Sequence, residues 1–174
     1  MSILDFLGLG KNDRPAEGDA EPDTVREIVS KLDRLEPQRA RYVASFAYLL
    51  SRVANADLDI SPEETGAMER IVSELGGLDH DQAILVVQMA KTHARLFGGT
   101  ENFLVSREFQ GLASAEQKIA LLRCLFAVSA ADDIISQVED NEIRQIASEL
   151  NVDQRDYAAL KAEFKDKLAV LKNP

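Results

Sequence analysis

A gap-free internal repeat is the feature that most constrains how this chain can fold. When the chain is aligned with itself, Leu50–Leu85 falls on Leu125–Leu160 without a gap, and 14 of the 36 aligned positions are identical. Identity at this level exceeds what shared helical composition produces, and it indicates a duplicated unit. Neither copy is large enough to bury its apolar faces alone. We therefore predict two related helical units packed about a pseudo-two-fold axis.

Apolar residues keep helical spacing in both copies and around them. Met68, Ile71, Val72 and Leu75, for example, fall at positions i, i+3, i+4 and i+7, which places them on one helical face. No stretch alternates apolar and polar residues with the β-branched enrichment typical of a strand. The expected helices include residues 25–35, 42–53, 68–75, 84–90, 101–110, 115–131, 138–150 and 157–171. The predicted fold class is all-α, a bundle of about seven or eight helices.

The N-terminal segment, residues 1–23, differs from the rest of the chain. Residues 1–7 are largely apolar, and residues 8–23 combine Gly, Pro and charged residues as a linker does, so we place the folded domain at residues 24–174. Asp5 interrupts the apolar start, which lacks a basic segment and a cleavage site, so we expect no signal peptide. No apolar run approaches the ~20 residues of a membrane helix. We expect a cytoplasmic protein without an integral membrane segment, and a weak N-terminal membrane contact stays open.

The chain is strongly acidic, and its acidic residues are concentrated in two segments. The chain has 20 Lys or Arg and 30 Asp or Glu, a net charge of −10 with His neutral. Such a balance argues against nucleic acid as a partner, because phosphate contacts need clustered basic residues. Residues 54–81 carry a net −7 and residues 129–156 a net −6, so the acidity lies in two patches, one in each copy.

Helix-capping sequences occur at four places. In a capping box, the first residue accepts a hydrogen bond from the amide three residues later, and that later side chain reaches back to the first amide. Segments of this form are Ser61 to Glu64, Asp79 to Gln82, Ser114 to Gln117 and Ser136 to Glu139. Each cap is expected to stabilise its helix by ~1 kcal/mol.

The carboxylates before and within two of these caps are candidate ligands of a divalent cation, such as calcium, magnesium or manganese, because hard cations prefer several oxygen ligands from a short segment. The candidates are Asp57, Asp59 and Glu64 in the first copy and Asp132, Asp133 and Glu139 in the second. An EF-hand is excluded, because Pro62 and Met68 occupy the positions of its required Gly and Glu. The alternative is purely structural: such acids also stabilise loops and helix N-termini. The residues alone leave both interpretations open.

Catalytic signatures are missing from the sequence. Cys124 lies in an apolar helical stretch, which favours a buried thiol, and as the one cysteine it excludes an internal disulfide and a multi-cysteine zinc site. His80 and His93 lack the spacing of a metal-binding pair. No nucleophile elbow, phosphate-binding loop or dinucleotide fingerprint occurs. We therefore predict that the protein is not an enzyme.

Both acidic segments resemble a family motif. Residues 54–64 and 129–139 are similar to the duplicated "A-D-G-x-I-S-x-x-E" motif of TerB-like domains, and residues 146–152 resemble the family's "I-A-x-x-L-x-(L/V)" segment. This group includes tellurite-resistance TerB proteins and the N-terminal domain of DjlA-type co-chaperones. The resemblance covers about residues 25–171, and it implies an all-helical bundle with internal pseudo-symmetry.

The resemblance also implies a role for the acidic loops, which are proposed in this family to bind divalent metal. The family Asp falls on Asp57 and Asp132, and the family Glu on Glu64 and Glu139, whereas the usual Gly is replaced by Leu58 and Asp133. The leading hypothesis is a non-enzymatic module in tellurite or chemical stress response that binds divalent cations. The alternative is a protein–protein interaction or co-chaperone-type adaptor module, with a protein partner and without a metal role.

Overall fold

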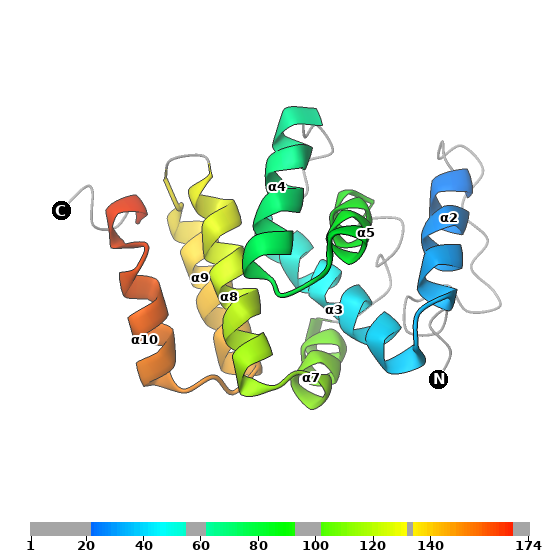
Figure 1. Cartoon of the computed structure of the whole chain (residues 1–174). Coiled ribbons are helices and arrows are strands. Elements are labelled where there is room, and N and C mark those ends of the chain that lie inside the picture. Colours follow the sequence, from blue (N-terminus) through cyan, green and yellow to red (C-terminus); the bar gives the residue numbers. More distant parts are fainter. Residues whose placement is uncertain (1–21, 55–61, 93–101, 132–133, 169–174) are drawn as a thin grey trace.

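The computed structural model describes residues 22–54, 62–92, 102–131 and 134–168 of the chain. Within these ranges it forms eight α-helices and a short 3-10 helix, η1 (Figure 1). The elements are α2 (Pro22–Asp33), α3 (Pro37–Ala54), α4 (Pro62–Leu75), α5 (His80–Lys91), α7 (Asn102–Leu112), α8 (Ala115–Ala130), α9 (Gln137–Glu149), α10 (Gln154–Ala162) and η1 (Lys165–Lys167). The predicted all-α bundle of about seven or eight helices is confirmed.

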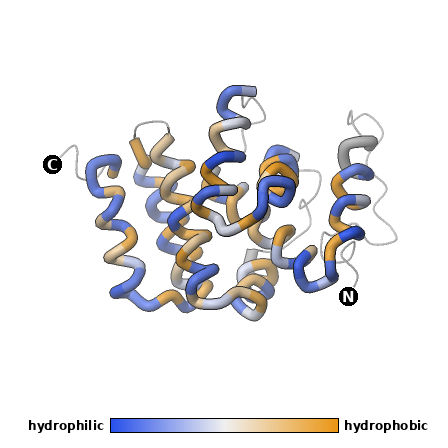
Figure 2. The backbone as a smooth tube through the Cα atoms, in the orientation of Figure 1, coloured by the Kyte–Doolittle hydropathy of each residue, from blue (hydrophilic) through white to orange (hydrophobic). Residues whose placement is uncertain are grey.

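Helix α3 is the centre of the bundle. Every residue from Tyr42 to Leu50 is buried, and α3 packs against α5, α7, α8 and α9. Helices α8, α9 and α10 lie together at one end of the molecule, and α2 lies at the other (Figure 1). Along the helices, apolar and polar residues alternate with the helical turn (Figure 2). This pattern is expected when each helix buries one side in a shared core.

Aromatic rings connect helices that are distant in sequence. Tyr42 of α3 stacks on Phe109 of α7 with 5.3 Å between ring centroids, and Phe46 meets the edge of the same ring at 6.3 Å. Phe126 of α8 stacks on Phe164, which follows α10, at 5.4 Å. Because such pairs add to the gain from apolar burial, they fix α7 and the C-terminal segment on the central helices.

Close packing around the turn after α4 explains why residue 76 is a glycine, Gly76. A Cβ atom at this position would lie 2.5 Å from the carbonyl oxygen of Val72 and 3.0 Å from Cζ of Phe46. The next residue, Gly77, has a φ of +71°, a conformation that side chains disfavour. The Gly pair therefore allows the chain to leave α4 while Phe46 stays packed beneath the turn.

The end of the chain differs from the prediction. The spacing predicts one helix carrying residues 157–171, but α10 ends at Ala162, and η1 follows. Leu168 instead forms an isolated parallel β-bridge with Ile135, and the Ile135 amide donates to the Lys167 carbonyl at 2.7 Å. The backbone pairing competes with helix continuation, and it places buried Leu168 against the start of the α9 segment.

The helix starts follow the repeat: α4 begins at Pro62 and α9 at Gln137, and these two residues are aligned with each other in the two copies. The pseudo-two-fold arrangement of the two copies in space stays a prediction. Helix α2 starts at Pro22, inside the predicted linker, because Pro is favoured at the first helical position. The other predictions for the N-terminal stretch fall on residues 1–21, outside the described residues.

Candidate functional site

The six candidate cation ligands are only partly covered by the described residues. Asp57 and Asp59 fall in 55–61, and Asp132 and Asp133 form the gap before Ile134, so these four lie outside the described ranges. The two glutamates are described. Glu64 is exposed in the first turn of α4, and Glu139 is half-buried in the first turn of α9. Each therefore stands at the N-terminus of a helix that directly follows an acidic segment.

The predicted capping box at the start of α9 is confirmed. The Glu139 amide donates to Ser136 Oγ at 3.1 Å, and the Ser136 amide donates to Glu139 Oε2 at 2.9 Å. This arrangement occupies one carboxylate oxygen and fixes the direction of the Glu139 side chain. A cation at this loop would share the Glu139 carboxylate with the Ser136 amide. Ser61, the counterpart in the first copy, lies outside the described residues.

Removing this cap tests its contribution. We expect Ser136→Ala to lower the free energy of unfolding by about 1 kcal/mol, because the Glu139 amide at the start of α9 loses its acceptor, Ser136 Oγ. Urea denaturation of the full chain measures the change. Ser30→Ala, at an exposed position inside α2, is the matched control and is expected to stay within about 0.5 kcal/mol of wild type. Equal effects of the two substitutions would contradict the capping role.

The other predicted caps differ in detail. The box of Ser114 and Gln117 is complete, with hydrogen bonds of 3.1 and 2.8 Å. At α5, Asp79 accepts from the Gln82 amide at 2.8 Å, but the reciprocal half of the predicted box is missing. Gln82 Oε1 instead accepts from Arg39 Nε and Nη2 at 3.1 and 2.6 Å. The side chain of Gln82 thus connects α5 to α3 rather than capping its own helix.

An arginine that the sequence interpretation missed neutralises part of the second acidic patch. Arg52 of α3 has a side chain only 7% exposed, and its Nε donates to Glu142 Oε1 at 2.7 Å. Its Nη2 lies 3.0 Å from Glu149 Oε2, and Ser106 of α7 donates to Glu149 Oε1 at 3.1 Å. Two acids of α9 are therefore paired with one buried arginine. Ala127 occupies the aligned position in the second copy, so the network has no repeat counterpart.

A second buried acid joins α9 to α10. Asp140 has a side chain only 6% exposed, and Lys161 donates to its Oδ2 at 3.1 Å. Arg144 lies 3.9 Å from the same oxygen. Of the four acids in α9, Asp140, Glu142 and Glu149 are thus paired with bases, whereas Glu139 accepts from the Ser136 amide in the capping box.

The described part of the chain offers few side chains suited to metal binding or nucleophilic catalysis. Among those residues, no three His, Cys, Asp or Glu side chains lie close enough together to hold a metal ion. Burial raises the pKa of the Cys124 thiol to about 12, which suppresses the reactive thiolate. His80 is the exposed first residue of α5, and His93 lies outside the described residues.

We next compared the chain with models of known protein families. A family model described as tellurite resistance protein TerB matches residues 42–162. The chain belongs to the TerB family. The matched part runs from the buried part of α3 to the end of α10, so it contains both acidic segments of the TerB domain and the helices that follow them, α4 and α9. Comparisons with curated proteins and with solved structures gave no match.

The TerB domain has no membrane-spanning candidate among its described helices. None of them combines the length and the apolar character that crossing a membrane requires. The longest, α3, has 18 residues but carries several Arg residues, and its apolar side chains are buried against other helices.

Proposed function

We propose that this TerB domain is a non-enzymatic cytoplasmic module of tellurite or chemical stress response that binds divalent cations at two loops. The first loop would supply Asp57, Asp59 and Glu64, and the second Asp132, Asp133 and Glu139. Calcium, magnesium and manganese are the candidates, because carboxylate oxygens suit these cations. The description of the matching family supports the tellurite-related role.

One observation carries the proposal. Both acidic segments lie within the family match, and each leads into a helix whose first turn presents a glutamate, Glu64 in α4 and Glu139 in α9. The Ser136 box holds Glu139 at the start of α9, which reduces the entropy cost of engaging a ligand there. Pairing of Asp140, Glu142 and Glu149 with bases removes much of the repulsion between this loop and the rest of α9.

Thermal melting tests the proposal. A ligand that binds only the folded state stabilises it by about 2.7 kcal/mol at a concentration 100 times its dissociation constant. We expect millimolar calcium, magnesium or manganese to raise the Tm of the full chain by several degrees, beyond the effect of sodium chloride at equal ionic strength. The double substitution Asp57→Asn with Asp132→Asn is expected to abolish the rise.

A matched control separates site chemistry from net charge. Asp81 and Asp156 are exposed, occupy identical positions in the two copies and lie in the same acidic patches. Asp81→Asn with Asp156→Asn therefore changes the charge equally and is expected to keep the metal-dependent rise in Tm. No rise in wild type, or an equal loss in both double variants, would contradict cation binding at these loops.

The alternative is a protein–protein interaction or co-chaperone-type adaptor without a metal role. Two apolar side chains next to the second acidic segment favour it, since Val138 is 79% and Ile134 48% exposed. An exposed apolar pair of this kind is common at contact surfaces. This alternative predicts that divalent cations leave the Tm unchanged relative to sodium chloride.

A further inference from the structure

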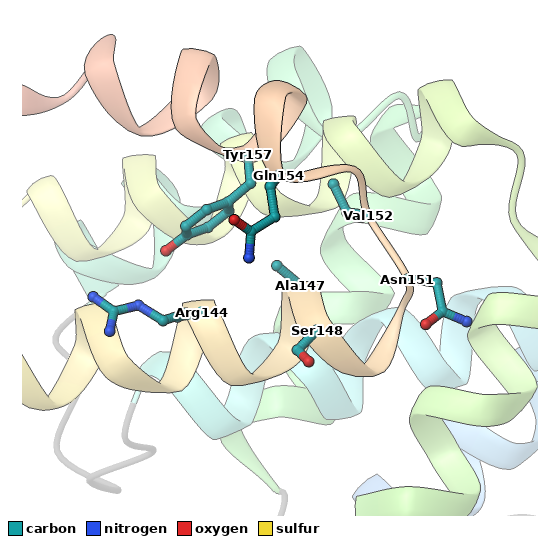
Figure 3. A pocket seen from close by; sticks show the side chains of 7 residues that line it. All are labelled: Arg144, Ala147, Ser148, Asn151, Val152, Gln154 and Tyr157. Carbon is teal, nitrogen blue, oxygen red and sulfur yellow. The ribbon is translucent and has the colours of Figure 1, made fainter.

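A pocket of about 350 Å³ lies between α9 and the start of α10, and none of the six candidate cation ligands lines it (Figure 3). Arg144, Ala147 and Ser148 line it from α9, whereas Val152, Gln154 and Tyr157 line it from the following turn and α10. Its volume is at the lower end of the range for small-ligand sites, about 300–1,000 Å³. It has room for a small polar group and a few carbon atoms.

Backbone hydrogen bonds hold the turn that forms one end of the pocket. Asn151 has a φ of 56°, its amide donates to the Ser148 carbonyl at 3.1 Å, and the Val152 amide donates to the Ala147 carbonyl at 3.0 Å. These two hydrogen bonds make a Schellman motif, in which Asn takes the usual place of Gly. Asp153 then caps α10 by accepting from the Arg155 amide at 2.7 Å. The backbone is therefore satisfied, and side chains supply the recognition groups.

One of these side chains, Arg144, is suited to an anion, and Tyr157 lies against it. Arg144 is 60% exposed, and its distance of 3.9 Å from Asp140 Oδ2 is too long for a hydrogen bond, so its guanidinium retains donors for a ligand. The Tyr157 oxygen is buried and lies beside Arg144, which forms a side-chain hydrogen bond with it that affects the pKa of the phenol. Burial and then the Asp140 charge raise the pKa of Tyr157, whereas the hydrogen bond with Arg144 and its charge lower it, so the phenol stays protonated and keeps its contact with Arg144 at neutral pH.

The charges of the side chains around the pocket favour one class of anion. Arg144 is the one ionised side chain among the seven that line the pocket, and Asp140 beneath it is already neutralised by Lys161 at 3.1 Å. A single guanidinium matches a single carboxylate, whose two oxygens fit the planar fork of donors. A phosphate dianion would find one base, Arg144, among the side chains that line the pocket, so half of its charge would stay uncompensated there.

We propose that the pocket between α9 and α10 binds a carboxylate, with Arg144 as its ionic partner and Tyr157 as the residue that positions Arg144. The small apolar surface of Ala147 and Val152 takes the adjoining carbon atoms. The carboxylate can belong to a free organic acid or to the C-terminus of a peptide. This site does not depend on cation binding at the acidic loops.

Amide chemical shifts of the 15N-labelled full chain test the proposal, with acetate and an acetylated tetrapeptide of three alanines and a C-terminal valine as probes. We expect saturable shifts centred on Ser148, Asn151 and Gln154, which sodium chloride at equal ionic strength does not reproduce. Arg144→Gln is expected to weaken binding about tenfold or more, because a charge-assisted hydrogen bond is lost. Tyr157→Phe, which removes the oxygen that holds Arg144, is expected to weaken binding severalfold in the wild-type chain and to have no further effect in Arg144→Gln.

Arg155→Gln is the matched control, since Arg155 is an exposed base beside the pocket but does not line it. It is expected to leave affinity within about twofold of wild type. Tighter binding of the tetrapeptide than of acetate, lost when its C-terminus is amidated, would support a peptide terminus; equal affinities would support a free acid. Shifts that rise linearly, that centre on other helices, or that fall equally in Arg144→Gln and Arg155→Gln would overturn the proposal.

Discussion

Arg52→Met is expected to lower the free energy of unfolding by about 2–4 kcal/mol, because it leaves buried charge without compensation. Glu149 is 16% exposed, and no hydrogen bond from the described residues reaches its Oε2, which lies 3.0 Å from Arg52. Glu142 is 34% exposed, so water screens its charge once Arg52 is gone. The expected loss of stability is therefore smaller than for a fully buried pair. Urea denaturation of the full chain measures the change.

Two further variants separate charge from packing. Arg123→Met removes a pair with Glu163 of similar length, 3.2 Å, but the two side chains are 36% and 51% exposed, so a loss below about 1 kcal/mol is expected. Adding Glu149→Leu to Arg52→Met is expected to recover most of the lost stability, because the uncompensated charge is then gone. If the double variant were less stable than Arg52→Met alone, packing rather than charge would explain the effect.

Phe46→Ala is expected to lower the free energy of unfolding by about 3–5 kcal/mol. The ring is completely buried on α3, lies 6.2 and 6.3 Å from the rings of Tyr42 and Phe109, and fills the space under Gly76. Its removal leaves a cavity at the junction of α3, α4 and α7, which a fixed turn at Gly76 cannot close.

The control for Phe46 is Leu104→Ala on α7. Leu104 is 55% exposed, so its truncation is expected to change the free energy of unfolding by no more than about 0.5 kcal/mol. Both values come from chemical denaturation under identical conditions. Comparable losses at the two positions would mean that Phe46 is not part of a closely packed core.

Local signals in the sequence predicted most of the fold. The apolar spacing placed the helices, and the Ser114 and Ser136 boxes predicted the starts of α8 and α9. These features succeed because helix period and capping depend on residues within one or two turns of each other. The repeat likewise predicted that helices begin at equivalent points of the two copies, as they do at Pro62 and Gln137.

Interactions between distant residues could not be predicted in the same way. The partner of Arg52 is 90 residues away in Glu142, and Gln82 leaves its predicted box for Arg39, which lies 43 residues earlier. The last helix ends early because Leu168 pairs with Ile135. One signal was present: Arg52 interrupts an apolar run of α3, and a base on a buried helix requires an acidic partner.

The same contrast between local signals and contacts of distant residues applies to the candidate site. The repeat and the local charge identified the glutamates that begin α4 and α9, whereas no local pattern indicated that Asp140 and Glu142, one residue and about one turn further on, are paired with bases of α10 and α3. Which acids remain available to a ligand depends on those tertiary partners. The pocket between α9 and α10 also depends on tertiary packing, since Arg144 and Tyr157 come from different helices.

Isothermal titration calorimetry of the full chain with manganese, calcium or magnesium tests the central claim most directly. We predict saturable heat for at least one of these ions with a stoichiometry of about two per chain, one for each acidic loop. Asp57→Asn alone and Asp132→Asn alone would each reduce it to about one. The absence of saturable heat at millimolar metal with a folded chain, or a stoichiometry unaffected by the two substitutions together, would contradict cation binding at the acidic loops.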